Sequence, residues 1–347
     1  MQNTNDIVSI FSSIKQKVER RTRPFDAINI LDPTIATENL GDKIIMSAVE
    51  NLIRELFPDL FFIHIPTHLP QTYTSRTLLS RGKFSIVGGT NAINNSILTW
   101  RCNWRVRVRD LIWLRNIILL GVGWKGYEHT VAINARVALR RMLSKNFIHS
   151  VRDEYTKKML NLAGIQNVLN TGCVTMWNLT PSHVSMIPAI KGDSVVFTIN
   201  EGHRDPVDKE LIKILRKHYT NVYFWPQGIY DREYLENIVD LNFTGINTLS
   251  PSLQSYDRLL EDQSVSIDYV GSRLHGGIRA LQNQRRTIVL SVDNRATEIA
   301  KDTKLPVVSK SDIDKIENMI CGNWHTTINL PREAIRDWKQ QFNKMRW

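Results

Sequence analysis

Cysteine is scarce in this chain, and its few cysteines do not form a framework. Cys102, Cys173 and Cys321 stand alone, without the CxxC spacing that structural zinc sites use. Their isolation excludes the disulfide network of a small secreted domain and fits a reducing compartment. We therefore expect three free thiols.

Long apolar runs are also missing. The longest run, 117–124, falls far short of the roughly 20 residues that a membrane-spanning helix needs. The first residues, MQNTNDIVSIFSS, lack the basic start and apolar core of a signal peptide. We expect a cytoplasmic protein.

Several enzyme signatures are absent from the sequence. Neither a Walker A sequence nor HExxH nor GxSxG occurs, so P-loop, metalloprotease and serine-hydrolase functions lack support. A GxGxxG pattern does occur at 121–126, but it lies late in its domain and holds a bulky Trp124. No acidic residue follows at the distance of a ribose contact. The pattern favours a tight turn over a dinucleotide site.

Acidic residues are outnumbered, with 34 Asp and Glu against 45 Lys and Arg, a net charge of +11. Such a charge attracts phosphates, nucleic acid or anionic lipid without selecting among them. The segment 100–115 mixes tryptophans with Arg105, Arg107 and Arg109. It is typical of a membrane surface, or of a strand whose arginines face outward and whose valines face inward.

Length and pattern predict two domains. The 347 residues exceed one ordinary core, and short β-branched runs alternate with amphipathic stretches, as in βα units. We expect two Rossmann-like domains with a cleft between them, resembling the GT-B type. The non-periodic stretch 178–191 reads as the linker, between an N-terminal domain (1–180) and a C-terminal domain (190–347) that includes a terminal helix at 331–345.

Each predicted domain contains six strands. In the first we expect strands at 27–31, 60–65, 84–87, 116–122, 147–151 and 167–170, with helices near 129–145 and 154–163. In the second we expect strands at 194–199, 221–225, 245–249, 266–270, 287–292 and 306–309, with a helix at 206–219. An apolar stripe from Ile44 to Leu56 predicts a further helix after the first strand.

The most informative motif is at 270–277, VGSRLHGG. A strand ends there on Arg273 and His275, and Gly276 and Gly277 open a helix. Unpaired amides at a helix N-terminus favour anions, so the motif predicts an anion site or, in the simpler interpretation, an ordinary βα turn. Arg204, after the first strand of the second domain, would add a cation at the same cleft.

A carboxylate on the N-terminal side completes the predicted site. Asp42 stands at the entry of the first amphipathic helix and is either its N-cap or a base that overlooks the cleft. Asn39 would help to orient an acceptor.

Seven short motifs, taken in order, resemble the polysaccharide pyruvyltransferase family over about residues 28–320. They are NLGD (39–42), IVGG (86–89), GVG (121–123), SVRDE (150–154), NTGCVT (170–175), GSRLHGG (271–277) and VDNRA (292–296). The resemblance implies a GT-B-like fold and transfer of pyruvate from phosphoenolpyruvate, as a ketal, to a sugar of a surface polysaccharide or its lipid-linked precursor.

The resemblance also assigns residues. Arg273, Leu274 and His275 match its donor-binding motif, with Arg204 as a second donor arginine, and Gly276 and Gly277 lie beside them. The acceptor side would include Asn39, Gly41, Gly88 and Gly89. Phosphoenolpyruvate is a substrate, so no cofactor, metal or nucleic-acid partner is expected.

The implied chemistry explains these residue types. A donor with a carboxylate and a phosphate needs two arginine forks, an acid for its methylene carbon and a base for the sugar hydroxyls. We predict His275 as the acid, and Asp42 or neutral His275 as the base. Two alternatives remain: a GT-B glycosyltransferase that uses a nucleotide sugar, and a non-catalytic protein that binds polyanions or membranes through 100–115.

Overall fold

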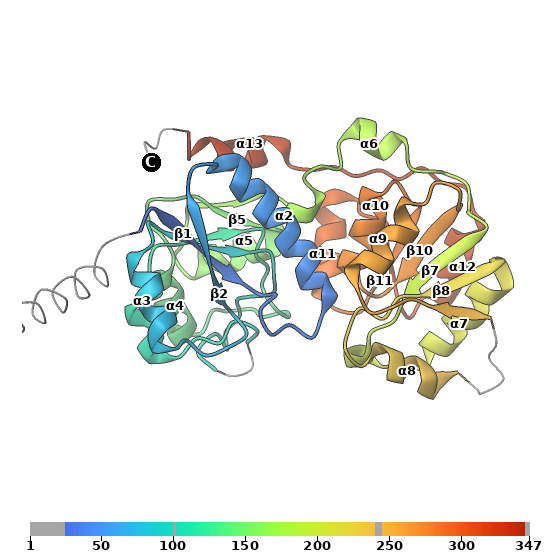
Figure 1. Cartoon of the computed structure of the whole chain (residues 1–347), viewed down its shortest axis with the longest axis horizontal. Coiled ribbons are helices and arrows are strands. Elements are labelled where there is room, and N and C mark those ends of the chain that lie inside the picture. Colours follow the sequence, from blue (N-terminus) through green and yellow to red (C-terminus); the bar gives the residue numbers. More distant parts are fainter. Residues whose placement is uncertain (1–24, 100–101, 240–244, 344–347) are drawn as a thin grey trace, which may run out of the picture.

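The computed structural model describes residues 25–99, 102–239 and 245–343, and these form two α/β domains side by side (Figure 1). Both sheets are parallel throughout, which confirms the predicted fold class of two Rossmann-like domains. None of the described helices is long and apolar enough to cross a membrane.

The N-terminal domain is built on a four-stranded sheet in the order β2-β1-β3-β4. The strands are β1 (Ala27–Asp32), β2 (Phe61–Pro66), β3 (Ser85–Gly88) and β4 (Ile117–Leu120). A two-stranded pair, β5 (His149–Val151) and β6 (Val168–Asn170), continues it through a bridge between Val122 and Val151. The helices are α2 (Leu40–Leu56), α3 (Tyr73–Arg81), α4 (Ile133–Met142) and α5 (Glu154–Leu162), and a 3-10 helix, η1, covers Val108–Ile112.

The C-terminal domain has a six-stranded sheet in the order β12-β11-β10-β7-β8-β9. Its strands are β7 (Ser194–Thr198), β8 (Asn221–Phe224), β9 (Ile246–Thr248), β10 (Ile267–Gly271), β11 (Thr287–Ser291) and β12 (Val307–Ser309). Its helices are α7 (Val207–His218), α8 (Asp231–Ile238), α9 (Leu253–Glu261), α10 (Leu274–Gln282), α11 (Asn294–Thr303) and α12 (Ile313–Cys321). The predicted strands are confirmed in both domains, within a few residues at each end.

Strand sequence explains the burial of the central strands. β1, β4 and β7 are buried along their whole length, because helices cover both faces of a parallel sheet. The sequences of these strands are therefore continuously apolar, whereas a half-exposed strand would alternate apolar and polar residues. The same arrangement directs the carboxyl ends of the strands in both sheets toward ligand-binding loops.

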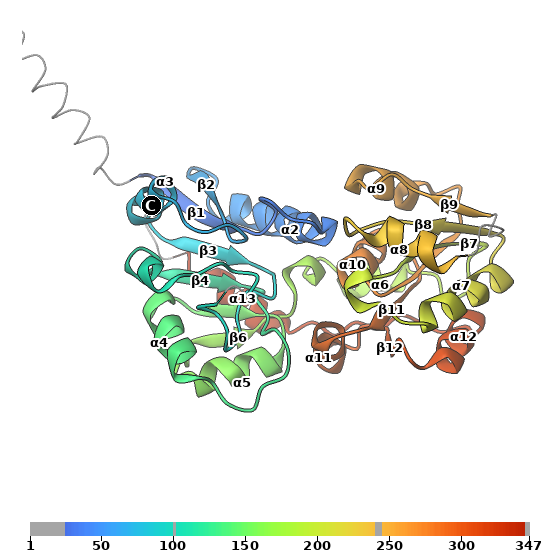
Figure 2. The ribbon, with the colours of Figure 1, turned by 90° about the horizontal axis from the view of Figure 1, so that it is seen from below.

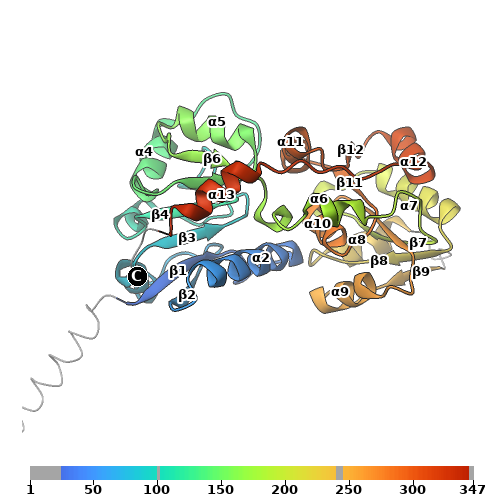
Figure 3. The same cartoon turned by 90° about the horizontal axis from the view of Figure 1, so that it is seen from above.

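The terminal helix α13 (Arg332–Gln340) belongs by packing to the N-terminal domain, not to the C-terminal domain in which sequence order had placed it. Its Trp338 is fully buried and meets the Trp177 ring edge to face at 5.8 Å. Just beyond the helix, the Gln341 Oε1 accepts a hydrogen bond from the Ile148 amide at 2.7 Å. Figures 2 and 3 show α13 among N-terminal elements. The chain thus crosses between the domains twice.

Trp100 and Arg101 lie outside the described residues, and the membrane surface predicted for 100–115 stays a prediction. The segment after residue 101 does not form the predicted strand. It is extended with alternate burial, Trp104 and Val106 pointing into the core, but it pairs with no strand ladder and ends in η1. Trp104 is fully buried, so it cannot serve as an interfacial anchor.

Candidate functional site

An open cavity of about 940 Å³ lies between the two domains. Asn91, Lys125 and Tyr127 line it from the N-terminal domain, and Asn200, His203 and Arg295 line it from the C-terminal domain. Contacts across the domains close one end, because Asn294 Nδ2 donates to the carbonyl oxygens of Trp124 and Gly126 at 3.1 and 3.2 Å. The predicted interdomain cleft therefore exists, and polar groups from both domains face it.

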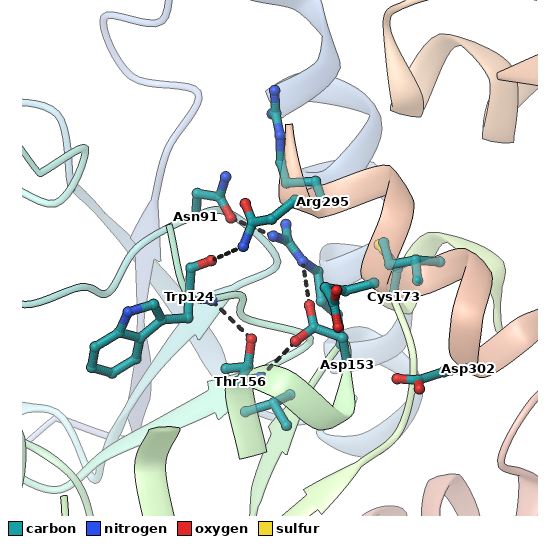
Figure 4. A network of polar contacts seen from close by, with 12 residues as sticks. Asn91, Trp124, Asp153, Thr156, Cys173, Arg295 and Asp302 are labelled. Atoms are coloured by element: carbon teal, nitrogen blue, oxygen red, sulfur yellow. Dashed lines mark hydrogen bonds and ion pairs between the residues drawn. The ribbon is translucent and has the colours of Figure 1, made fainter. Parts of the chain in front are cut away.

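Arg152 is an unusual cation that does not itself line this cavity but bonds Asn91, which does. Its side chain is 1% exposed, Nε donates to Asp153 Oδ2 at 3.2 Å, and Nη2 donates to Asn91 Oδ1 (Figure 4). The third nitrogen, Nη1, is buried without a hydrogen-bond partner among the described residues. A buried unpaired donor costs free energy, about 1–3 kcal/mol and more when charged, unless a ligand satisfies it. Since Asn91 lines the cavity, an anion there could accept from Arg152.

Arg295 supplies a second cation from the opposite wall. Its Nε and Nη2 both bond Asp293 Oδ2, two residues earlier, at 2.7 Å. This pair is about a quarter exposed, so an anionic ligand can compete for the guanidinium at modest cost. Lys125 adds a third positive charge to the lining. Asp293 lines the cavity as well, so the C-terminal wall carries an ion pair and the N-terminal wall carries the cation Lys125.

His275 lies buried near both arginines. It is the second residue of α10, is 5% exposed, and its Nε2 stands 3.7 Å from Cys173 Sγ. Burial, followed by the charges of Arg295 and Arg152, lowers the pKa of His275 to about 3. The ring is therefore neutral at neutral pH, whereas the sequence interpretation required an imidazolium.

Asp42 is buried at the third position of α2. The helix is capped by Asn39, whose Oδ1 accepts from the Gly41 amide at 3.0 Å, so Asp42 is not the N-cap. Asp42 Oδ2 accepts from Thr37 Oγ1 at 2.5 Å. Burial raises the pKa of Asp42, and the charge of Arg295 acts in the opposite direction. The charge of Arg295 thus acts on both Asp42 and His275, although neither of them is among the described residues that line the cavity.

Asn39 joins the two domains. Its Oδ1 also accepts from Gln227 Nε2 at 2.8 Å, and the amide of Leu40 donates to the Gln227 carbonyl at 2.9 Å. The α2 N-terminus therefore docks on the C-terminal domain. A Cβ on Gly41 would lie 2.8 Å from Gln227 Nε2, which explains the glycine at this contact.

Arg273, the predicted donor cation, is held by a carboxylate. It caps α10, and its Nε and Nη2 both bond Asp231, which is fully buried. Nε also donates to the Ile199 carbonyl at 3.3 Å. Breaking a buried pair strands a charge, which costs several kcal/mol. In this structure Arg273 ties β7, α8 and α10 together.

Arg204, the second predicted donor cation, is turned away from the cavity. Its side chain is 56% exposed and bonds Glu201 Oε1 at 2.7 Å. Its neighbours Gly202 and His203 line the cavity, but among the described lining residues Arg204 does not occur. The loop 202–204 thus lies at the edge of the cleft, and the donor role predicted for Arg204 stays a prediction.

The predicted glycines pack against the protein instead of facing a ligand. A Cβ on Gly277 would meet Val289 at 2.6 Å, and one on Gly276 would meet Gln227 and Tyr269, so these residues seat α10 closely on its sheet. Leu274 is 6% exposed and belongs to the core of that domain. Gly88 and Gly89 lie beneath α2, where a Cβ would meet Val49 at 2.8 Å and Ile45 at 2.6 Å, respectively.

Sequence reasoning missed Arg152 and Arg295 as site residues, although both lie in motifs of the family resemblance. Each follows the end of a strand, β5 or β11, the position where open α/β sheets bind ligands. A further signal was Gly123, where a Cβ would stand 2.2 Å from the Arg152 guanidinium carbon. The GxGxxG pattern therefore makes room for an arginine.

One group of side chains in the described residues could hold a metal ion. Asp32, Glu50 and His64 bring ligand atoms within 4.8 Å of one another. His64 Nδ1 already bonds Asp32 Oδ2 at 2.7 Å, and Asp32 Oδ1 accepts from the Thr34 amide and hydroxyl at 2.7 Å. The cluster is satisfied as an ion pair, and none of its members lines the interdomain cavity.

Comparison with known proteins identifies the family and the fold. Residues 39–294 match the family model described as polysaccharide pyruvyl transferase, whereas no curated protein matches the chain. S. aureus MnaA, solved with UDP, is 10% identical at a TM-score of 0.52, covering 87% of this chain and 92% of its own. UDP-GlcNAc 2-epimerase from Neisseria meningitidis is 10% identical (TM-score 0.49; 92% and 100% covered), and the wall teichoic acid polymerase TagF is 11% identical (0.44; 94% and 84%).

Proposed function

Because this chain belongs to the polysaccharide pyruvyl transferase family, we propose that it transfers pyruvate from phosphoenolpyruvate to two hydroxyls of a sugar. The product is a pyruvate ketal, and phosphate is released. The acceptor is a sugar of a surface polysaccharide or its lipid-linked precursor. The observation that carries the proposal is the buried, unsatisfied Arg152 nitrogen beside a cavity that Arg295 lines from the other domain.

We assign the donor to Arg152 and Arg295 instead of Arg273 and Arg204. Phosphoenolpyruvate carries a carboxylate and a phosphate, and each suits the fork of one guanidinium. Arg152 has a donor to spare, and Arg295 is held only by a partly exposed carboxylate. Arg273 would have to leave buried Asp231. Binding between two domains would also bring their walls together.

The reaction begins at the methylene carbon of the donor. A proton added to the methylene carbon of the donor forms the methyl group and leaves C2 as an oxocarbenium-like centre. One sugar hydroxyl attacks C2 and gives up its proton to a base. The C2–O bond to phosphate breaks, and phosphate leaves with the electron pair and takes the proton held by the base. The second hydroxyl attacks C2 and gives its proton to His275, which restores the acid.

His275 is our candidate for the acid, and donor binding would raise its pKa. Burial is the main cause of its low pKa, and the charges of Arg295 and Arg152 lower it further; an anion between these arginines would cancel their contribution and leave that of burial. Asp42 is the candidate base, because burial raises the pKa of its carboxyl and improves its ability to accept a proton.

A thermal-shift comparison tests the donor class. Phosphoenolpyruvate, pyruvate, inorganic phosphate and a panel of nucleotide sugars are each added to the full chain, because a ligand that binds only the folded state raises its melting temperature. We expect phosphoenolpyruvate to stabilise the protein more than either fragment. The Arg152→Lys variant should lose this effect, because lysine lacks the fork, while Arg204→Lys should keep it.

The same experiment separates the rival functions. Stabilisation by a nucleotide sugar, with no response to phosphoenolpyruvate, would reject our proposal in favour of a GT-B glycosyltransferase. Stabilisation by every polyanion alike, lost in high salt, would instead indicate a non-catalytic binder.

A further inference from the structure

Nearly all the net charge of this chain comes from one part of the N-terminal domain. Residues 60–152 contain 14 Lys and Arg and only two Asp and Glu, a net charge of +12, against +11 for the whole chain. The two acids are already engaged, since Asp110 is buried against Arg76 Nη2 at 2.7 Å and Glu128 accepts from Trp124 Nε1 at 2.6 Å. The helices α3 and α4 contain no acid at all.

Large apolar side chains are exposed on the same elements. Tyr73 at the start of α3 is 75% exposed, Val108 and Ile112 on η1 are 68% and 55% exposed, and Ile133 and Val137 on α4 are 80% and 60% exposed. η1 and α4 contact each other. Figures 1 and 2 place α3 and α4 at the end of the N-terminal domain away from the C-terminal domain. Exposed apolar groups that gather at one end of a molecule mark an interaction surface.

A groove of about 670 Å³ runs between α3 and η1 within this region. Leu69, Pro70 and Tyr73 line it on one side, and Arg107 and Arg109 line it on the other. The described lining residues include no Asp or Glu. The groove is therefore lined by apolar side chains together with arginines.

Hydrogen bonds to the buried Asp110 hold η1 against α3 beneath these exposed side chains. Asp110 Oδ1 accepts from both Nε and Nη2 of Arg76, at 3.1 and 2.7 Å, and Asp110 Oδ2 accepts from the Arg107 amide at 3.1 Å. The Arg76 guanidinium also stacks on the Trp113 ring at 4.9 Å. With Trp104 and Val106 anchored in the core, the exposed side chains project from a preformed platform.

We propose that this surface, defined by Tyr73, Val108, Ile112, Arg107 and Arg109, docks on a bilayer that contains anionic phospholipids. The arginines meet the negative headgroups, and the apolar side chains enter the boundary with the acyl chains. A soluble polyanion would account for the arginines but would leave the exposed Tyr, Val and Ile without a role. The inference does not depend on the reaction in the cleft.

Vesicle flotation with the full-length chain tests the docking. We expect the protein to float with vesicles of phosphatidylcholine and phosphatidylglycerol and to stay behind with pure phosphatidylcholine. Val108→Ser with Ile112→Ser, and separately Arg107→Gln with Arg109→Gln, should each reduce the bound fraction. Each arginine near an anionic surface is worth roughly a fivefold change in partition. Val108, Ile112 and Arg109 are exposed and Arg107 is half-buried, so unchanged melting temperatures will confirm that the variants fold.

Matched variants on other surfaces serve as controls. Met186→Ser with Ile190→Ser removes apolar groups that are 56% and 67% exposed in the linker, and Arg232→Gln with Arg258→Gln removes two exposed charges from the C-terminal domain. Both should float as the parent chain does.

Three results would overturn the proposal. The parent chain could fail to float with anionic vesicles. The arginine variant could lose binding while the apolar variant binds unchanged, which would indicate attraction to polyanions alone. The control variants could lose binding as much as the surface variants, which would indicate a non-specific effect of the net charge.

Discussion

At the scale of single residues, the site depends on which arginine nitrogens already have hydrogen-bond partners within the protein. Arg273 Nε and Nη2 both bond the buried Asp231. By contrast, Arg152 has one buried nitrogen without a hydrogen-bond partner among the described residues, and Arg295 bonds Asp293, which is partly exposed. The sequence shows that these three residues are arginines and that each follows a strand. It does not show which carboxylate each arginine bonds. Asp231 lies 42 residues before Arg273, and no local pattern connects them.

Replacing His275 with Gln tests the proton donor. Gln fills much of the same space but cannot deliver a proton, so we expect phosphoenolpyruvate binding to persist and turnover to fall at least a hundredfold, roughly the contribution of a general acid. Phosphate release in the presence of acceptor measures turnover, and calorimetry measures binding. Turnover close to that of the parent chain would exclude His275 as the acid.

A second buried histidine predicts how stability depends on pH. His149 Nδ1 accepts from the Leu119 amide at 3.2 Å and its Nε2 lies 2.9 Å from the Ser144 carbonyl, so the ring is neutral in the fold. Burial lowers the pKa of His149 to about 4, below its unfolded value of 6.5. Between these values the unfolded chain binds more protons, so stability falls as pH falls, by up to about 1.4 kcal/mol per pH unit.

Denaturant unfolding between pH 4 and 6.5 measures this effect. The His149→Gln variant should be less stable at pH 7 but should show a shallower loss on acidification. His325→Gln, at an exposed position of the C-terminal domain, is the matched control and should keep the parent slope. An unchanged slope in His149→Gln would show that this ring does not titrate on unfolding.

At the scale of elements, the turn after β4 positions the site. Gly123 lies against Arg152, and Gly121 adopts a φ of +64° that favours glycine. We predict that Gly123→Ala displaces the Arg152 guanidinium and weakens phosphoenolpyruvate binding by tenfold or more. Gly164→Ala is the control, because it lies outside the cavity lining, its Cβ would meet only Arg140 at 3.8 Å or more, and its φ of +85° gives it a similar cost in stability. Equal loss of binding in both variants would reject this role for Gly123.

The terminal helix gives a second prediction at this scale. Trp338 is fully buried among Trp177 and Phe342, so Trp338→Ala should destabilise the protein by about 3–5 kcal/mol. Hydrogen exchange should show that the loss is concentrated in β5, β6 and α2 of the N-terminal domain. Loss confined to β11 and β12 would contradict the packing. The exposed Arg336→Ala variant should change neither quantity.

At the scale of the whole molecule, the sequence predicts the architecture better than the site. Strands such as 27–31 and 194–199 carry their own apolar signal, so both sheets were predictable from local pattern. The return of α13 to the first domain was not, because an amphipathic helix does not specify which surface it covers. The burial of Trp104, which removes it from any interface, likewise depends on the fold around it.

Calorimetric titration of phosphoenolpyruvate into the parent chain, Arg295→Gln and Arg204→Gln tests the central claim most directly. We predict that the parent chain binds, that Arg204→Gln binds with the same affinity, and that Arg295→Gln binds roughly ten to a hundred times more weakly, the loss of one charged hydrogen-bonding partner. Full affinity in Arg295→Gln together with lost affinity in Arg204→Gln would contradict the account and move the donor to the other edge of the cleft.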